Sequence, residues 1–167
     1  MLTKFKVVSA ILSLALTLLL GVKTFASQIT VPAGQTIQAI VTTPINSKNL
    51  SLGQTVTMVV GEDFYYNNKL IAPFESVLTG SVINVSKADD KSAGKLYLRF
   101  TQVVTPYGIQ VPLAAIVKTS DKTGKMSGKD YEHKDESNNV NIPVNTPVEL
   151  LLTQPITVNP EVYNTNY

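Results

Sequence analysis

The chain of 167 residues contains no cysteine. This absence excludes disulfide bonds, thiolate catalysis and zinc sites with cysteine ligands. It also excludes a lipoprotein anchor, because such an anchor requires a cysteine at the cleavage site. The fold must therefore be stabilised by burial of apolar side chains and by hydrogen bonds between strands.

Recognisable catalytic motifs are also missing. No serine lies in a nucleophile elbow, and the sequence has no aspartic-protease triplet, phosphate-binding loop or dinucleotide-binding glycine pattern. The single histidine, His133, lies among charged residues, and we interpret it as a solvated surface residue because no second histidine could share a metal with it. The adjacent carboxylates Glu62-Asp63 and Asp89-Asp90 follow expected strands and are interpreted as turn residues. We predict a non-enzymatic protein without a metal or cofactor.

The first 26 residues resemble a secretory signal peptide. Lys4 and Lys6 precede an apolar run over Val7–Leu20, and Thr24-Phe25-Ala26 supplies small residues for cleavage after Ala26. We therefore expect an N-terminal signal helix and export to the periplasm or the extracellular side of the cell envelope. The alternative is an uncleaved leader, which would be the chain's only contact with the membrane.

Removal of this leader changes the charge balance. The whole chain has 14 basic and 12 acidic residues, but three of the lysines (Lys4, Lys6 and Lys23) belong to the leader. The remaining 11 basic and 12 acidic residues are nearly balanced. Net charge therefore gives no support to a nucleic-acid partner.

The rest of the sequence predicts an all-β domain. It has no long amphipathic helical pattern, and its β-branched runs are separated by Gly, Pro, Asn and Asp. In 95–104, Leu96, Leu98 and Phe100 alternate with Tyr97, Arg99 and Thr101, and we expect the first set to face the core. The expected strands are 36–42, 55–60, 64–66, 70–71, 77–85, 95–104, 109–117 and 148–152, with turns at 67–69 and 105–108.

One domain is expected to span residues 27–158. Within it, residues 118–141 hold five lysines, five carboxylates and the histidine, so we expect a mobile charged loop without a strand. Residues 159–167 are expected to form a flexible tail.

An internal repeat points to the architecture. Residues Val31–Ile45 align without gaps with Ile142–Ile156, and Ala72–Val82 is a fainter copy. In the two clear copies, proline begins the unit, and Gly34 and Asn145 take the position where a turn needs an unusual φ. Related strands near the two ends could pair and close a small antiparallel barrel or a sandwich-like barrel. The alternative is chance similarity between strand-and-turn units.

Several segments resemble a known family. The motifs VPAGQTIQAIVTTPINS, LGQTVTMVV, LIAPFESVLTGSV, LYLRFTQVVTPYGIQVPL and IPVNTPVELLLTQPITV are similar, in this order, to the C-terminal domain of TrbI-type channel proteins of conjugation and type IV secretion. The resemblance spans residues 30–158. It implies an extracytoplasmic β-barrel that assembles into a ring at the outer membrane, and it implies no reaction.

This sequence departs from the long members of that family. They carry a cytoplasmic N-terminus, an inner-membrane span and a proline-rich linker, and a helical pair inserted in their barrel reaches the outer membrane. Here the only long insertion is 118–141, whose ten charges make membrane crossing implausible. The resemblance therefore implies a small stand-alone version of the domain.

The aromatic residues suggest where such a domain makes contacts. Tyr65, Tyr66 and Tyr107 are the candidate partner or ligand residues, although the Phe64–Tyr66 cluster could instead pack in the core. We expect an envelope domain that acts through contacts with envelope proteins or with its own copies. The alternative is an exported barrel whose mouth binds a small molecule or a glycan.

Overall fold

The computed structural model describes residues 28–128 and 138–159, and the regular structure in these ranges consists of strands. The predicted signal helix and His133 lie outside the described residues. In chain order, the strands are β1 (Ile29–Val31), β2 (Thr36–Val41), β3 (Ile45–Asn46), β4 (Thr55–Val60), β5 (Phe64–Tyr66), β6 (Lys69–Ala72), β7 (Val77–Ser86), β8 (Lys95–Val104), β9 (Gln110–Val117), β10 (Lys125–Ser127), β11 (Asn141–Ile142), β12 (Pro147–Leu152) and β13 (Ile156–Val158).

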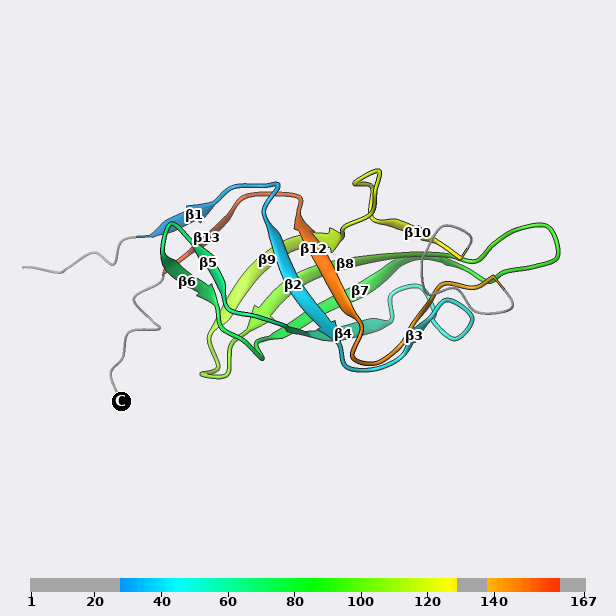
Figure 1. Cartoon of the computed structure of the whole chain (residues 1–167), viewed down its shortest axis with the longest axis horizontal. Coiled ribbons are helices and arrows are strands. Elements are labelled where there is room, and N and C mark those ends of the chain that lie inside the picture. Colours follow the sequence, from blue (N-terminus) through cyan, green and yellow to red (C-terminus); the bar gives the residue numbers. More distant parts are fainter. Residues whose placement is uncertain (1–27, 129–137, 160–167) are drawn as a thin grey trace, which may run out of the picture.

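Six of these strands form a closed antiparallel barrel (Figure 1). Their order is β8-β7-β4-β2-β12-β9, and pairing of β9 with β8 completes the circle. Closure gives every barrel strand two neighbours, which removes exposed sheet edges. The small pairs β1–β13, β3–β11 and β5–β6 extend from the barrel, and β10 adds to the beginning of β8.

The predicted pairing of the two repeat strands is confirmed. Strands β2 and β12 are antiparallel neighbours, with Ile40 opposite Pro147 and Thr36 opposite Leu151. The alternation in β8 is also confirmed, since Leu96, Leu98 and Phe100 are buried while the alternate side chains lie outside. Because aliphatic side chains and Phe100 fill the interior, the barrel is a packed core.

The repeat has a shared turn geometry. Gly34, Glu75 and Asn145 occupy equivalent positions and have φ angles of 90°, 62° and 64°. Each of these residues donates its N–H to the last carbonyl of a neighbouring strand. The last residue of that neighbouring strand donates its own N–H back to the carbonyl of the residue that directly follows Gly34, Glu75 or Asn145. The donor and acceptor pairs are Gly34–Leu152 and Leu152–Gln35, Glu75–Val60 and Val60–Ser76, and Asn145–Val41 and Val41–Thr146, at 2.8–3.1 Å.

A fourth copy of this turn precedes β4. Gly53 has a φ of 79° and donates its N–H to Val82 O at 2.8 Å, while Val82 donates its N–H to Gln54 O at 2.9 Å. Its first residue is Ser51 rather than proline, so the sequence comparison did not include it. The same pair of backbone hydrogen bonds thus begins four barrel strands.

The expectation of a strand-free segment at 118–141 is wrong. Strand β10 lies within it, with Met126 opposite Leu96, and the short β11 begins at Asn141. Strand β9 pairs with β8 from Arg99 onward, so β10 takes the neighbouring position beside the start of β8. The average composition of the segment concealed its buried apolar side chains, Met126 and Val140.

The outer face of the barrel carries one ion pair among the described residues. Lys118 Nζ bonds Glu149 Oε2, and Gln38 Nε2 donates to Glu149 Oε1 at 3.1 Å. The hydrogen bond from Lys118, followed by the one from Gln38, lowers the pKa of Glu149 below its usual value. All three side chains come from neighbouring barrel strands or the residue directly after β9.

No helix in the described ranges has the length and apolar character that a membrane span requires.

Candidate interaction surface

The β5–β6 hairpin divides the predicted aromatic cluster between two environments. Tyr65 points outward and is 54% exposed, whereas Phe64 and Tyr66 are half-buried and pack against the core. Asn67 and Asn68 form the tip with φ angles of 49° and 60°, as expected for a two-residue hairpin turn. Of this cluster, Tyr65 alone has its side chain mainly in solvent.

Asp63 connects Tyr65 to the turn before β7. Its Oδ2 accepts a hydrogen bond from Tyr65 Oη at 3.4 Å, and its Oδ1 accepts one from the Phe74 N–H at 2.7 Å. Phe74 is 48% exposed because it stands at the second position of the repeated turn. The hairpin and the turn therefore present Tyr65 and Phe74 from adjoining segments.

Two further exposed side chains come from the adjacent barrel strands. Val77 begins β7, lies opposite Val104 at the end of β8 and is 41% exposed. Tyr107 lies in the turn directly after β8 and is 58% exposed. The N–H of Gly108 closes this turn on Thr105 O at 2.9 Å, as the sequence predicts. We call Tyr65, Phe74, Val77 and Tyr107 the aromatic end of the barrel.

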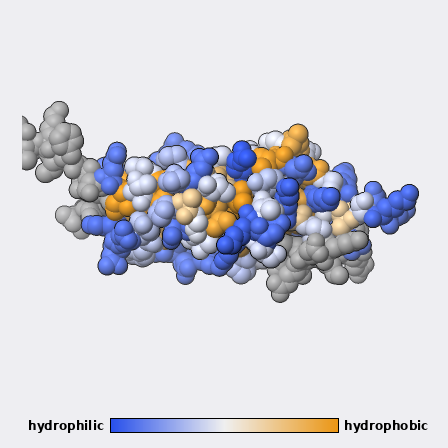
Figure 2. Space-filling model, turned by 90° about the horizontal axis from the view of Figure 1, so that it is seen from above, coloured by the Kyte–Doolittle hydropathy of each residue, from blue (hydrophilic) through white to orange (hydrophobic). Residues whose placement is uncertain are grey.

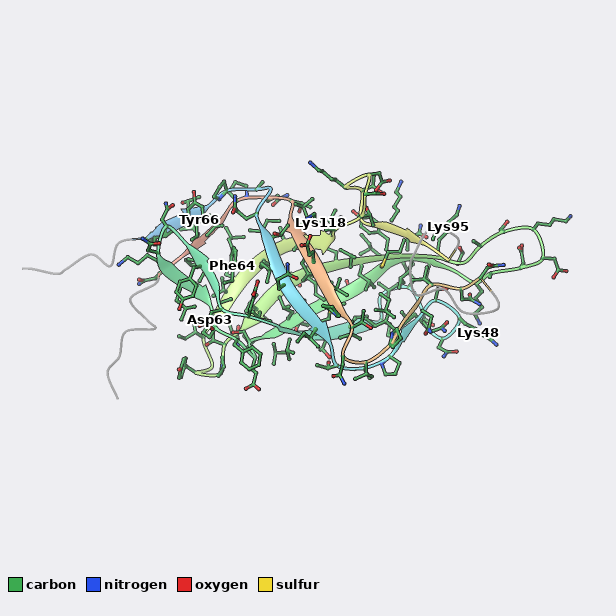
Figure 3. All side chains as sticks on the ribbon, in the orientation of Figure 1. Lys48, Asp63, Phe64, Tyr66, Lys95 and Lys118 are labelled. Atoms are coloured by element: carbon green, nitrogen blue, oxygen red, sulfur yellow. The ribbon has the colours of Figure 1, made fainter. Side chains whose placement is uncertain are left out.

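Charge is distributed unevenly along the molecule. The aromatic end lies beside three exposed carboxylates (Glu62, Asp63 and Glu75) and one lysine, Lys69. Figure 3 shows Asp63, Phe64 and Tyr66 at one end of the ribbon and Lys48 and Lys95 toward the other. The tip of the β7–β8 loop at that other end is hydrophilic throughout (Figure 2).

One carboxylate of each predicted turn pair, Asp63 and Asp89, binds backbone N–H groups of a turn. Asp63 holds the Phe74 N–H, and Asp89 Oδ1 accepts the N–H groups of Lys91 and Ser92 at 2.9 and 2.7 Å. Within residues 28–128 and 138–159, no three His, Asp or Glu side chains are grouped closely enough to hold a metal ion.

Comparison with solved structures finds proteins of similar fold. No family model matches the sequence, and no curated protein matches it. Among solved structures, ComB10 of the Com type IV secretion system of Helicobacter pylori is similar, with a TM-score of 0.51 and 14% identity. The similarity covers 75% of this chain and 88% of that chain. Because ComB10 is a TrbI-family protein, the resemblance seen in the sequence is confirmed at the level of the fold.

Proposed function

We propose that this protein is an exported, non-enzymatic domain of the cell envelope that acts through protein–protein contacts. The observation that carries the proposal is the aromatic end. It holds four of the six large apolar side chains that the described residues expose, all on adjoining segments. Grouped aromatic side chains on a soluble surface are typical of sites that bind another protein. The partner is an envelope protein or a second copy of this chain.

Two other observations support the proposed location in the cell envelope. The first 26 residues have the pattern of a secretory leader. The barrel also shares its fold with a component of a type IV secretion system.

The barrel mouth is less suited to a ligand. Large side chains such as Phe100, Leu98 and Leu150 are fully buried inside the barrel and fill its interior. A small molecule would therefore need a site on the outer surface.

The proposal is tested with two matched double variants of the mature protein. Phe74→Ser with Tyr107→Ser removes half of the aromatic end, and Leu52→Ser with Val144→Ser removes the exposed apolar side chains outside it. If the partner is a second copy of the chain, we expect the first double variant to weaken self-association, measured by sedimentation, at least tenfold. If the partner is an envelope protein, the same variant should lower the amount of that identified protein that co-purifies stoichiometrically at least tenfold. The second pair should leave both unchanged. Equal behaviour of the two variants, or a monomer without a stoichiometric partner, would contradict the proposal.

A further inference from the structure

A second surface lies on the outer face of β8. Lys95, Tyr97, Arg99 and Thr101 alternate along this face, while the intervening side chains enter the core. Strand geometry separates successive members by roughly 7 Å, so the row spans about 20 Å. The row is therefore long enough to contact several units of an extended polymer.

Two hollows adjoin this row, and Tyr97 lines both of them. One has a volume of about 530 Å³, and its lining includes Asn84, Ser86, Lys95, Tyr97, Lys125 and Ser127. The other has a volume of about 320 Å³, and its lining includes Tyr97, Arg99, Thr101, Ile116, Thr153 and Gln154. We call this pair of hollows the β8 groove. Their volumes are in the range of small-ligand sites.

The strand register brings the polar groups together around the ring. Asn84 and Lys125 lie opposite Tyr97 on its two neighbouring strands, and Ser86 and Ser127 lie opposite Lys95 in the same way. Among residues 28–128 and 138–159, those that line the two hollows include three cations and no carboxylate. The groove is thus suited to a ligand that is both anionic and rich in hydrogen-bonding groups.

The Tyr97 ring is held in place by the segment that follows β9. A Cβ added at Gly124 would lie 2.9 Å from Tyr97 Cε2 and 2.9 Å from Ile116 Cβ, so the backbone packs directly on both residues. Asp121 stabilises this segment by accepting hydrogen bonds from Thr119 and Thr123 at 2.6–3.0 Å. A ring fixed in this way is a preorganised platform for a flat ligand face.

We infer that the β8 groove binds an acidic linear glycan. In this arrangement the Tyr97 ring contacts the apolar face of one sugar, and Lys95, Lys125 and Arg99 bind its carboxylate or phosphate groups. The hydroxyl and amide side chains bind sugar hydroxyls. This activity is separate from the protein contacts proposed for the aromatic end.

The same geometry disfavours two other anionic polymers. An acidic peptide gains much of its affinity by pairing with a free strand edge, but β8 is already paired on both sides along the groove. Single-stranded nucleic acid binds on several aromatic platforms, whereas Tyr97 is the one aromatic side chain of the described residues that lines either hollow.

The test measures binding of octagalacturonate, as an acidic glycan, and of maltooctaose, as a neutral one, by calorimetry on the mature protein. We expect octagalacturonate to bind in a salt-dependent manner and maltooctaose to bind at least tenfold more weakly. Tyr97→Ala should lower octagalacturonate affinity at least tenfold, Tyr97→Phe should retain it, and Tyr107→Ala is the exposed-tyrosine control.

A charge variant keeps the test valid if Tyr97→Ala does not fold. The triple variant replaces three exposed residues, by Lys95→Gln, Lys125→Gln and Arg99→Gln. It should lower the affinity for octagalacturonate at least tenfold. The matched control Lys48→Gln, Lys69→Gln and Lys91→Gln removes the same charge elsewhere and should change it less than twofold. Three results would overturn the inference: no binding at millimolar octagalacturonate, equal losses in the two triple variants, or equal affinity for an octaglutamate peptide or an oligothymidylate.

Discussion

The aromatic end and the β8 groove differ in nearly every property that determines what a surface binds. The aromatic end exposes four large apolar side chains, two in turns and two in the strands beside them, next to three carboxylates. The groove presents three cations and several hydroxyl and amide groups around one aromatic ring. Apolar area suits a protein surface, whereas a charged polar groove suits a hydrated polymer. One barrel therefore offers two kinds of surface at separate places.

The aromatic end also differs from the region beyond the groove in how its segments are held together. The turns of the aromatic end are held by backbone hydrogen bonds and by the side chains of Asp63, Ser76 and Thr105. The region beyond the groove depends on Asn139, which is buried and joins three segments. Asn139 Oδ1 accepts hydrogen bonds from Ser47 Oγ at 3.1 Å and from the Ala88 N–H at 2.9 Å. Ser47 Oγ accepts one from the Val140 N–H at 3.1 Å.

The largest effect is expected from Met126→Ala. Met126 is buried against the core, so its truncation should cost about 3 kcal/mol of unfolding free energy. Urea denaturation measures this loss, and hydrogen exchange should show it concentrated in β10 and the start of β8. A loss below about 0.5 kcal/mol, typical of a surface site, would mean that β10 is not part of the sheet.

Asn139→Ala should have the next largest effect. It leaves the Ala88 N–H without its acceptor and Ser47 Oγ without one partner, at a cost of about 2 kcal/mol. The matched control is Asn84→Ala, an exposed position that should change stability by less than about 0.5 kcal/mol. Equal losses in the two variants, measured by urea denaturation, would show that the buried network does not hold this region together.

A smaller gain is expected at the aromatic end from Glu75→Asn. Glu75 has a φ of 62°, a conformation that costs a residue with a Cβ about 1 kcal/mol and that asparagine adopts more readily. The unfolding free energy should rise by about 0.5 kcal/mol. The control is Glu62→Asn, on the same surface and without a positive φ. An equal gain in unfolding free energy there would show that removal of a negative charge, and not the backbone conformation, causes the effect.

The smallest expected effect is a pH dependence of the unfolding free energy that arises from Glu149 in the barrel wall. The lowered pKa of Glu149 means that its bonds to Lys118 and Gln38 stabilise the fold above the ordinary value of 4.5 and lose this contribution as the pH falls through the lowered value. Glu149→Gln should therefore reduce stability at pH 7 and make little difference at strongly acidic pH. A difference between the two proteins that does not change with pH would contradict this assignment.

Several elements of the fold could be predicted from the sequence because their signals are local. Alternation placed Leu96, Leu98 and Phe100 inside, and the repeated proline units correctly predicted that β2 and β12 pair. Strand β10 was missed because a three-residue strand is too short to show a period, and Met126 is its single buried apolar residue. The positive φ of Glu75 was hidden because a turn of this kind usually has glycine or asparagine there.

The candidate surfaces were harder to predict because they depend on distant segments. Tyr65 and Tyr107 could be named as exposed aromatic candidates, but Phe74 and Val77 join them only through the Asp63 hydrogen bond and the pairing of β7 with β8. Tyr66 was named as well and is half-buried. Tyr97 was correctly placed outside the core, yet its position between Asn84 and Lys125 follows from two strand registers that no local pattern records.

Site-specific photo-crosslinking in living cells measures whether the aromatic end is the surface that contacts other proteins. A photoreactive residue is placed at Phe74 or Tyr107, and at Leu52 as a more exposed apolar position (72%) outside this surface. We expect one discrete crosslinked product from both Phe74 and Tyr107 and none from Leu52. Crosslinks from Leu52 alone, or none from Phe74 and Tyr107, would contradict this expectation.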